Sequence, residues 1–582
     1  YIDDIVIERL EEVPVTVTEV VNGDFSSGLD NWKTANAGDK FKIEDSKLHI
    51  TGGSEAGSYI EQTIATQKGV YYTIKMDTES GSGKYQVYDE SGETLLADES
   101  NTYFCVENRA KVLLRIMNTK EDTVVTKVAI EEAKVDPVKG RDKVNASTET
   151  TTLSMVDESA TDATKSLYAY LQDVGKENIL FGHQTDNSEG IVKDGVTSDT
   201  YHTVGAYPAI TGFEMASVAG DQDKYVALVK EAYKNNSIAT LCDHMPNFSS
   251  TASDSTFSDM TPTYENIMPG GKDNAKFLER LDATAAFAQA CIDDNGNPIP
   301  IIYRPFHENS GMWFWWGVSN MTKDQFVNLW RYAVEYLRDV KGVHNLLYAY
   351  SPNGHFSSED NYLSRYPGDD YVDIIGFDIY HDKPSYDSKW MEQTKKDAKK
   401  ASKIAKKKGK VAAITEVGLR YDGSNGLADE GNEIKNWYTM LCDEIMSDED
   451  AKQVAYMMTW RNQDKTHFWV PYDDGNGDRH EMANDFTAFY NRNDVIFADR
   501  IGNIGELKGI TVSKHEDTVY FAAPITGEKI NGTSKILVKT NVSDDNVDKV
   551  TVSVGDESYD AQKDDMYYFI NLDTTKFADG QY

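Results

Sequence analysis

Two patterns of hydrophobic and polar positions divide the chain. Over residues 1 to about 138, short runs rich in β-branched and aromatic residues alternate with Gly, Ser and Asp turns, and no helical period lies between them. These runs cover 15–18, 40–43, 47–50, 71–74, 84–87, 111–116 and 124–128. Short strands at this spacing predict an antiparallel β-sandwich of jelly-roll type.

From about residue 153, apolar β-branched runs alternate with segments of helical period. The runs cover 179–184, 209–214, 238–244, 300–308, 346–352, 372–380, 411–416 and 454–462. Helical patterns lie near 221–236, 272–293, 322–341, 386–408 and 427–446, with shorter ones near 192–203 and 357–366 and a closing one near 481–493. Eight strand-helix units predict a (β/α)8 TIM barrel over 153–502.

The remaining segments complete a multidomain plan. Residues 139–152 are polar and aperiodic, which predicts a linker. Short β runs without helices return at 509–512, 519–522, 536–540, 549–554 and 567–570. They predict an immunoglobulin-like β-sandwich over 503–582. The chain stops one residue after the turn at 579–581, where a last strand is expected, so we expect this sandwich to be truncated.

Polar side chains follow the predicted barrel strands at their carboxyl ends, where barrel enzymes carry their reactive groups. In strand order they are His183, Glu214, His244, Arg304 with His307 and Glu308, Asn353, Asp378 with Tyr380 and His381, Glu416, and Trp460 with Arg461 and Asn462. Such convergence predicts one site at the barrel mouth. Glu308 and Glu416, on strands four and seven, face each other there, and a carboxyl separation of ~5–5.5 Å would suit retaining glycoside hydrolysis.

The neighbours of the two glutamates indicate different protonation states. Glu416 lies in an apolar run with Arg304 as a charge partner, which favours the ionised form. Glu308 opens into the aromatic stretch 313–316, where a raised pKa is easier to maintain. These tryptophans also suit the apolar face of a sugar ring, although Trp315 and Trp316 are equally explained as packing.

Composition excludes several other classes of protein. The net charge is −37, from 59 Lys+Arg against 96 Asp+Glu, which disfavours nucleic acid as a partner. No apolar run approaches the ~20 residues of a membrane span. The cysteines are scattered and form no CxxC pair, so we expect neither a metal site nor a disulfide framework.

Several barrel motifs together carry a resemblance to a known family. They are Arg304-Pro305-Phe306-His307-Glu308, Trp313-Phe314-Trp315-Trp316-Gly317, Gly376-Phe377-Asp378-Ile379-Tyr380, Ile414-Thr415-Glu416-Val417-Gly418 and Thr459-Trp460-Arg461-Asn462, preceded by Phe181-Gly182-His183-Gln184 and His244-Met245-Pro246-Asn247. In this order they resemble glycoside hydrolase family 26, most of whose members are endo-β-1,4-mannanases.

The resemblance implies roles by position. Glu308 would be the acid/base and Glu416 the nucleophile, with Trp313 and Trp460 stacking on sugar and Tyr380 hydrogen-bonding near the nucleophile. The residues that would bind hydroxyls or orient the pair are His244, Asn247, His307, Asp378 and Arg461. Three simpler interpretations stay open: Asp378 only pairs with Arg304, Arg461 is structural, and His183 only supports the barrel floor.

The N-terminal segment carries a second resemblance. Residues 22–32, from Asn22 to Trp32, resemble the opening of sandwich-type carbohydrate-binding modules. Trp32 would stack on sugar or lie in the core. Asp24 and Asp30 are candidate ligands for a structural calcium, with a solvated turn as the alternative.

We therefore expect a secreted, extracellular, monomeric endo-β-1,4-mannanase that hydrolyses mannan, glucomannan or galactomannan with retention and without a cofactor. The loops 249–271 and 464–480 are expected to line the cleft and set the number of subsites. Two alternatives remain: the same mechanism on mixed-linkage β-glucan or xylan, and a non-hydrolytic polysaccharide-binding protein. The presence of both Glu308 and Glu416 argues against the latter.

Overall fold

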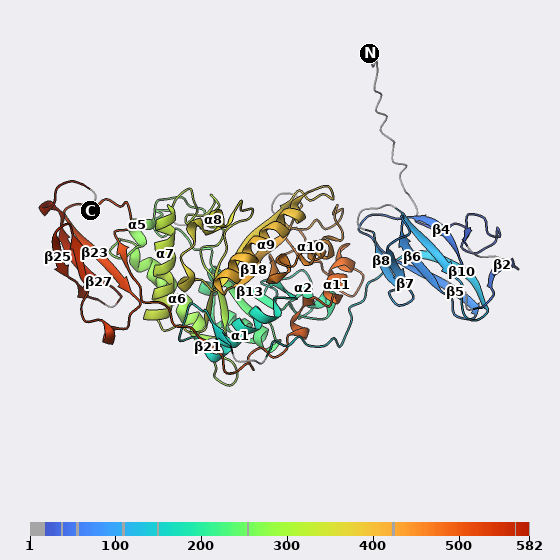
Figure 1. Cartoon of the computed structure of the whole chain (residues 1–582), viewed down its shortest axis with the longest axis horizontal. Helices are drawn as coiled ribbons and strands as arrows, with labels where there is room; N and C mark the ends of the chain where they lie inside the picture. Colours follow the sequence, from blue (N-terminus) through green and yellow to red (C-terminus); the bar gives the residue numbers. More distant parts are fainter. Residues whose placement is uncertain are drawn as a thin grey trace, which may run out of the picture.

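The computed structural model describes residues 18–580 except 36–38, 54–56, 107–110, 148–150, 253–254, 422–424 and 565. Most of the run predicted at 15–18 therefore lies outside the described residues, as do 148–150 of the predicted linker. Three bodies lie in a row, with a β-sandwich at one end, a barrel in the middle and a small group of sheets at the other end (Figure 1).

The N-terminal body is a sandwich of two antiparallel sheets, as predicted. One sheet has the order β1 (Lys33–Ala35), β4 (Tyr59–Ala65), β9 (Lys111–Met117), β6 (Tyr85–Asp89), β7 (Leu95–Asp98). The other has the order β2 (Phe41–Glu44), β3 (Lys47–Ile50), β10 (Thr123–Glu132), β5 (Tyr71–Ser80), β8 (Tyr103–Cys105). Alternate residues such as Leu48, Ile60 and Leu114 point into a shared core. Trp32 belongs to this core: it packs on Phe25 and is 7% exposed, so it offers no sugar platform.

The central body is the predicted barrel. Its strands are β12 (Ile179–Gln184), β13 (Ile210–Glu214), β14 (Ile238–Cys242), β15 (Ile301–Arg304), β16 (Leu346–Tyr350), β17 (Ile374–Asp382), β18 (Val411–Arg420) and β19 (Val454–Thr459). Each pairs in parallel with the next, and β12 closes the ring by pairing with both β13 and β19. Their near-continuous burial explains why they read as apolar runs and not as alternating ones.

The helices follow the predicted alternation with some differences. They are α1 (Asp162–Val174), α2 (Asp199–Val204), α3 (Met215–Gly220), α4 (Gln222–Lys234), α5 (Tyr264–Ile267), α6 (Asn274–Ala290), α7 (Lys323–Glu335), α8 (Glu359–Tyr362), α9 (Trp390–Lys408), α10 (Trp437–Met446) and α11 (Ala483–Asn491). The hydrophobic pattern did not predict α1, which buries Leu167 and Leu171 under the barrel. It also did not predict a short strand, β20 (Val495–Ile496), which pairs with β12.

The helix expected over 427–446 begins only at Trp437. The preceding residues form a loop because the Asn432 side chain bonds backbone groups of Ala428 and the carboxylate of Glu481. Side-chain amides that compete in this way for backbone partners disfavour a helix.

The C-terminal body contains a sheet in the order β22 (Val519–Ala523), β23 (Thr533–Thr540), β27 (Tyr568–Asp573), β26 (Gln562–Lys563) and a separate pair β24 (Thr551–Val554) and β25 (Glu557–Asp560). One predicted strand of this domain lies elsewhere. β21 (Thr511–Val512) pairs in parallel with β11 (Thr152–Leu153), at the end of the predicted linker. The two segments that flank the barrel are therefore joined to each other.

Both end bodies make specific contacts with the barrel. On the N-terminal side the Tyr71 hydroxyl donates to the buried Asp485 carboxylate at 2.8 Å, and Asn484 bonds the backbone of Ala133 and Val135. On the C-terminal side the buried Glu335 accepts a hydrogen bond from Tyr520 at 2.6 Å. None of the helices in the described part of the chain combines the length and the apolar character needed to cross a bilayer.

We predict that Tyr71→Phe weakens the contact between the sandwich and the barrel by about 1–3 kcal/mol, because the buried Asp485 carboxylate loses the one of its donors that comes from the sandwich. Limited proteolysis should then cleave between residues 134 and 147 faster than in the wild type. Tyr103→Phe is the matched control, since that ring packs 6.0 Å from Tyr71 in the same cluster. Equal cleavage rates in all three proteins would contradict the prediction.

Candidate active site

The floor of the barrel mouth is a buried ion-pair triad. Arg304, at the end of β15, donates from Nη1 to Asp378 at 2.7 Å and from Nη2 to Glu416. A bulge in β18, with Thr415 as the extra residue, sets Asp378 of β17 directly beside Glu416. Thr415 donates to Asp378, and the Tyr380 hydroxyl donates to Glu416 at 2.6 Å. Glu416 thus has both carboxylate oxygens engaged by donors, which fixes its orientation.

The second glutamate lies above this triad on a loop and not within a strand. β15 ends at Arg304, and the chain then turns, with Glu308 at a φ of 51°, in the left-handed region that non-glycine residues rarely adopt. Its Oε2 accepts a hydrogen bond from Trp313 Nε1 at 2.6 Å, and its Oε1 accepts one from Asn353 at 3.3 Å. Burial, together with the neighbouring Glu416 carboxylate, raises the pKa of Glu308 to about 6.

The two glutamates are close enough to act on one bond. Carboxylate oxygens of Glu308, Asp378 and Glu416 all lie within 4.8 Å of one another. That distance fits the short separation of a retaining pair and leaves no room for the water that an inverting pair, at ~6.5–9.5 Å, must hold between its carboxyls.

Two histidines beside the pair have different electrostatic surroundings. The His244 and His307 rings meet edge to face at 4.5 Å. Although burial opposes the charge, the Glu214 carboxylate, 2.6 Å from Nδ1, raises the pKa of His244 above its usual value. Burial, with the charges of Arg304 and His244, lowers the pKa of His307 well below its usual value. The two adjacent imidazoles therefore have pKa values displaced in opposite directions.

Glu214 is a site residue that the predicted set of functional residues omits. It ends β13, and its carboxylate also accepts the His244 backbone N–H at 3.0 Å. Although burial opposes it, the His244 charge lowers the pKa of Glu214 to about 2. Its position at a strand end was the available signal, but nothing in the sequence linked it to His244.

The aromatic residues divide into exposed and buried members. Trp313 is 44% exposed beside Glu308, and Trp460 lies partly exposed, 5.7 Å from His244. Trp315 and Trp316 are fully buried, and their indole N–H groups donate to the carbonyls of Met245 and His307. The packing interpretation therefore holds for these two.

Two residues predicted to bind substrate are engaged elsewhere. The buried Asn247 side chain donates to the carbonyls of Asp259 and Thr261, so it holds the loop over 249–271. Arg461 lies 3.3 Å from Glu189 and also bonds Gln463. Both side chains remain near the mouth, but their contacts with a substrate stay predictions.

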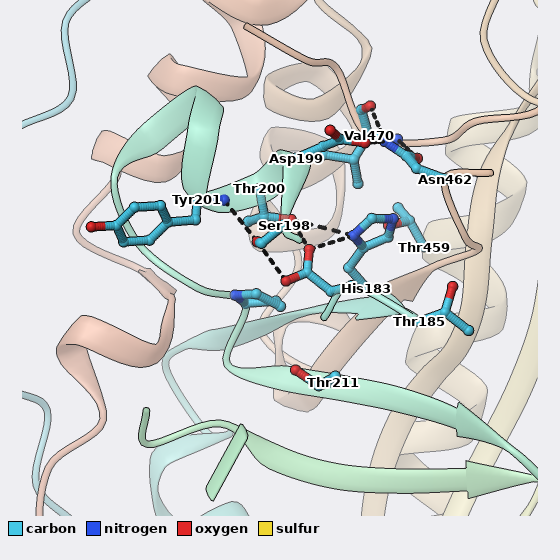
Figure 2. A network of polar contacts seen from close by, with 12 residues as sticks. His183, Thr185, Ser198, Asp199, Thr200, Tyr201, Thr211, Thr459, Asn462 and Val470 are labelled. Carbon is cyan, nitrogen blue, oxygen red and sulfur yellow. Dashed lines mark hydrogen bonds and ion pairs between the residues drawn. The ribbon is translucent and has the colours of Figure 1, made fainter. Parts of the chain in front are cut away.

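His183 lies within a closed polar network at the ends of β12 and β19 (Figure 2). It is fully buried, and its Nδ1 lies 2.7 Å from Asp186, whose carboxylate also accepts hydrogen bonds from Ser198 and Thr200. Asn462 donates at 2.8 Å to Asp199 of the same segment. The network joins two loops below the cleft, which agrees with a supporting role for His183.

Both predicted cleft loops reach the site. Phe257, from the loop over 249–271, lies 4.9 Å from the His244 ring, and its carbonyl accepts the Trp315 backbone N–H. Trp469, from the segment 464–480, packs 6.3 Å from Tyr380. Trp469 also fills the space beside Gly418, where a Cβ would lie 2.4 Å from its ring.

A (β/α)8 barrel whose fourth and seventh strands bring two glutamates together at the carboxyl-end mouth defines the class of barrel glycoside hydrolases. Residues 156–454 match the model of glycosyl hydrolase family 26. The chain belongs to this family.

Relatives and solved structures agree with that assignment. The chain is 33% identical over 409 residues to a mannan endo-1,4-beta-mannosidase of Bifidobacterium adolescentis, covering 67% of this chain and 40% of that protein. A modular endo-beta-1,4-mannanase from Cellulomonas fimi superposes with a TM-score of 0.66 at 32% identity, covering 73% of this chain and 95% of that one. The catalytic domain of an endo-beta-1,4-mannanase from Bacillus sp. JAMB-750 superposes with a TM-score of 0.60 at 37% identity, covering 64% of this chain and 100% of that one. The chain spans less than half the length of its first curated relatives.

We predict that Trp313→Phe raises the pKa of Glu308 above its value of about 6, because the indole N–H stabilises the ionised carboxylate. The expected rise is about one unit, since a hydrogen bond to a charged group contributes on the order of 1.5–3 kcal/mol when buried and less when half-exposed. A ¹³C-NMR titration of labelled glutamate would measure it. Trp390→Phe, which changes a ring stacked on His381, is the control and should leave the pKa of Glu308 at its wild-type value. An unchanged or lowered pKa of Glu308 in Trp313→Phe would refute the prediction.

Proposed function

We propose that the protein is a retaining endo-β-1,4-mannanase that hydrolyses internal bonds of mannan, glucomannan or galactomannan. One observation carries the mechanism: two glutamates lie within 4.8 Å, one held among the donors of Arg304 and Tyr380 and the other with a pKa of about 6. The choice of mannan rests on the names of the relatives, several of which are mannan endo-1,4-beta-mannosidases.

The reaction proceeds in two displacements at the anomeric carbon. Glu416 attacks that carbon while Glu308 gives its proton to the departing glycosidic oxygen, so the bond to the leaving chain breaks as the glycosyl-Glu416 ester forms. Glu308, now ionised, removes a proton from a water that attacks the same carbon and releases Glu416. No cofactor takes part. Because Glu308 must start protonated, kcat/KM falls as the pH rises through about 6.

The groups around the pair have separate tasks in this proposal. Arg304 and Tyr380 hold Glu416 in position, and Asp378 in turn holds Arg304. The exposed face of Trp313 and the ring of Trp460 provide apolar contact for sugar rings at the point of cleavage. His244 and His307 donate to sugar hydroxyls, and hydrogen bonds of this kind distinguish an axial from an equatorial 2-hydroxyl.

The finer features also belong to the proposal. We propose an extracellular, secreted and monomeric enzyme that acts on hemicellulose, because a mannan chain is a polymer met outside the cell. The N-terminal sandwich would bind polysaccharide, supported by the resemblance of residues 22–32, although not through Trp32. A calcium near Asp24 stays a prediction: Asp24 bonds Ser26 within its own turn, and the candidate metal groups among the described residues lie in the barrel.

A panel of polymers tests the substrate. Reducing ends should appear with linear mannan and glucomannan far faster than with lichenan or xylan, and early products of several lengths indicate internal cleavage. ¹H-NMR of the first products should show the β-anomer, as retention requires. Preference for lichenan or xylan would move the assignment to the alternative glycans, and early α-anomers would exclude retention.

We predict that Glu416→Ala lowers kcat on mannan by at least about 10³-fold while substrate binding is largely kept, because the nucleophile is lost and the cleft is unchanged. Turnover and calorimetric binding of a mannan oligosaccharide measure the two quantities. Glu430→Ala, at an exposed glutamate in the loop after the same strand, is the matched control. Substantial residual turnover in Glu416→Ala would show that another residue is the nucleophile.

A further inference from the structure

The loop over 305–317 has an unusual backbone for the segment that carries an acid/base residue. Phe306 and Glu308 both have positive φ values, of 48° and 51°. Such conformations persist only where the surroundings hold them in place. The Glu308 N–H donates to the Ser351 carbonyl at 2.7 Å, but the rest of the loop needs other partners.

Arg365 supplies two of these partners from a separate segment. It ends the short 3₁₀ helix Leu363–Arg365 and is 3% exposed. Its Nη1 donates to the Asn309 carbonyl at 2.8 Å, and its Nη2 donates to the Trp316 carbonyl at 3.0 Å. Its guanidinium lies 4.5 Å above the ring of Phe326 on α7. One side chain therefore connects Asn309 and Trp316, which lie on either side of Trp313 in this loop.

The contacts of Arg365 reach both neighbours of Glu308. Asn309 follows Glu308 directly, and its carbonyl is held by the arginine itself. His307 precedes Glu308, and its carbonyl accepts the indole N–H of Trp316, whose own carbonyl is the second acceptor of Arg365. The peptide segments before and after Glu308 are thus tied to the same guanidinium.

Packing alone does not explain an arginine at this position. Among the described residues no carboxylate lies within ion-pair distance of Arg365, and burial lowers the pKa of Arg365 to about 10. A buried guanidinium without a counter-charge is unfavourable, and an apolar side chain would fill the same volume at lower cost. The two carbonyls each accept from a different nitrogen of Arg365, in the planar fork that only a guanidinium presents.

We propose that Arg365 is a positioning residue that holds Glu308 in place for proton transfer. The inference rests on the proposed hydrolysis, in which Glu308 must reach the glycosidic oxygen. Without the brace, the loop relaxes from its positive-φ conformation and the carboxyl moves from that oxygen, and a displacement of ~1 Å can cost on the order of 10²-fold in rate. Glu416, held by Arg304 from other strands, keeps its place.

The test compares two substrates that differ in their need for an acid. Cleavage of a linear mannan oligosaccharide requires proton donation to the leaving sugar, whereas a dinitrophenyl β-mannobioside releases a phenolate that departs unprotonated. For Arg365→Met we expect kcat/KM on the oligosaccharide to fall about 10²-fold, with a much smaller fall, below about fivefold, on the aryl glycoside. Arg365→Lys keeps the charge but cannot span both carbonyls, so it should show the same split.

The controls separate this role from a general loss of structure. Arg331→Met is matched, because Arg331 also donates to a backbone carbonyl, that of Pro367, and stacks on the Tyr371 and Tyr520 rings, yet it touches no part of the loop. Arg331→Met should leave the ratio of kcat/KM on the oligosaccharide to kcat/KM on the aryl glycoside at its wild-type value. Rates are expressed per competent site, counted with a fluorosugar that traps Glu416, so that a poorly folded Arg365→Met still reports a ratio.

Three outcomes would overturn the inference. Parallel losses on both substrates in the arginine variants, or no loss in either, would show that Arg365 only supports the fold. A wild-type protein inactive on mannan and on the aryl glycoside would refute the proposed function instead, and the inference with it. An active wild type with a selective loss on the unactivated substrate supports both.

Discussion

The site depends on one buried cation. Arg304 ends β15 and bonds two carboxylates from the sixth and seventh barrel strands, so three strands meet at a single guanidinium. Removing Arg304 would leave two carboxylates buried without a counter-charge, which commonly costs ~3–5 kcal/mol. Because the planar fork fixes angles as well as distances, it also determines where Glu416 points. The contacts that orient Glu416 are therefore the same contacts that join strands β15, β17 and β18 at the barrel mouth.

The environment, and not the residue type, assigns the proton states around this cation. Two glutamates and two histidines lie side by side, yet the members of each pair have different partners. Glu416 has Arg304, while Glu308 has an indole and an amide; His244 has Glu214, while His307 has the charges of Arg304 and His244 nearby. Separating the pKa values of like groups in this way is how one site holds an acid and a base together.

Much of this arrangement could be predicted from the sequence. The eight barrel strands read as apolar runs because both faces are buried, and their order placed Glu308 opposite Glu416. The sequence pattern did not predict side-chain roles that depend on tertiary contacts. The family resemblance placed Asn247 among the residues that bind substrate, but its amide is used by a loop that follows it. Arg365 lies in a short helix with no motif around it. A sequence shows which residues stand near a strand end, but not which backbone groups they will bond.

The pairing of β11 with β21 has a mechanical consequence. The residues before the barrel and those after it form a parallel ribbon, with Thr511 N–H bonded to the Thr151 carbonyl and Ser513 N–H to the Leu153 carbonyl. Val144 and Arg500 add another such bond further out. If the two flanking bodies are pulled apart, as when one is anchored and the other holds a polymer, the ribbon is loaded in shear along its strands. The load would then pass through this ribbon and bypass Glu308 and Glu416 at the barrel mouth.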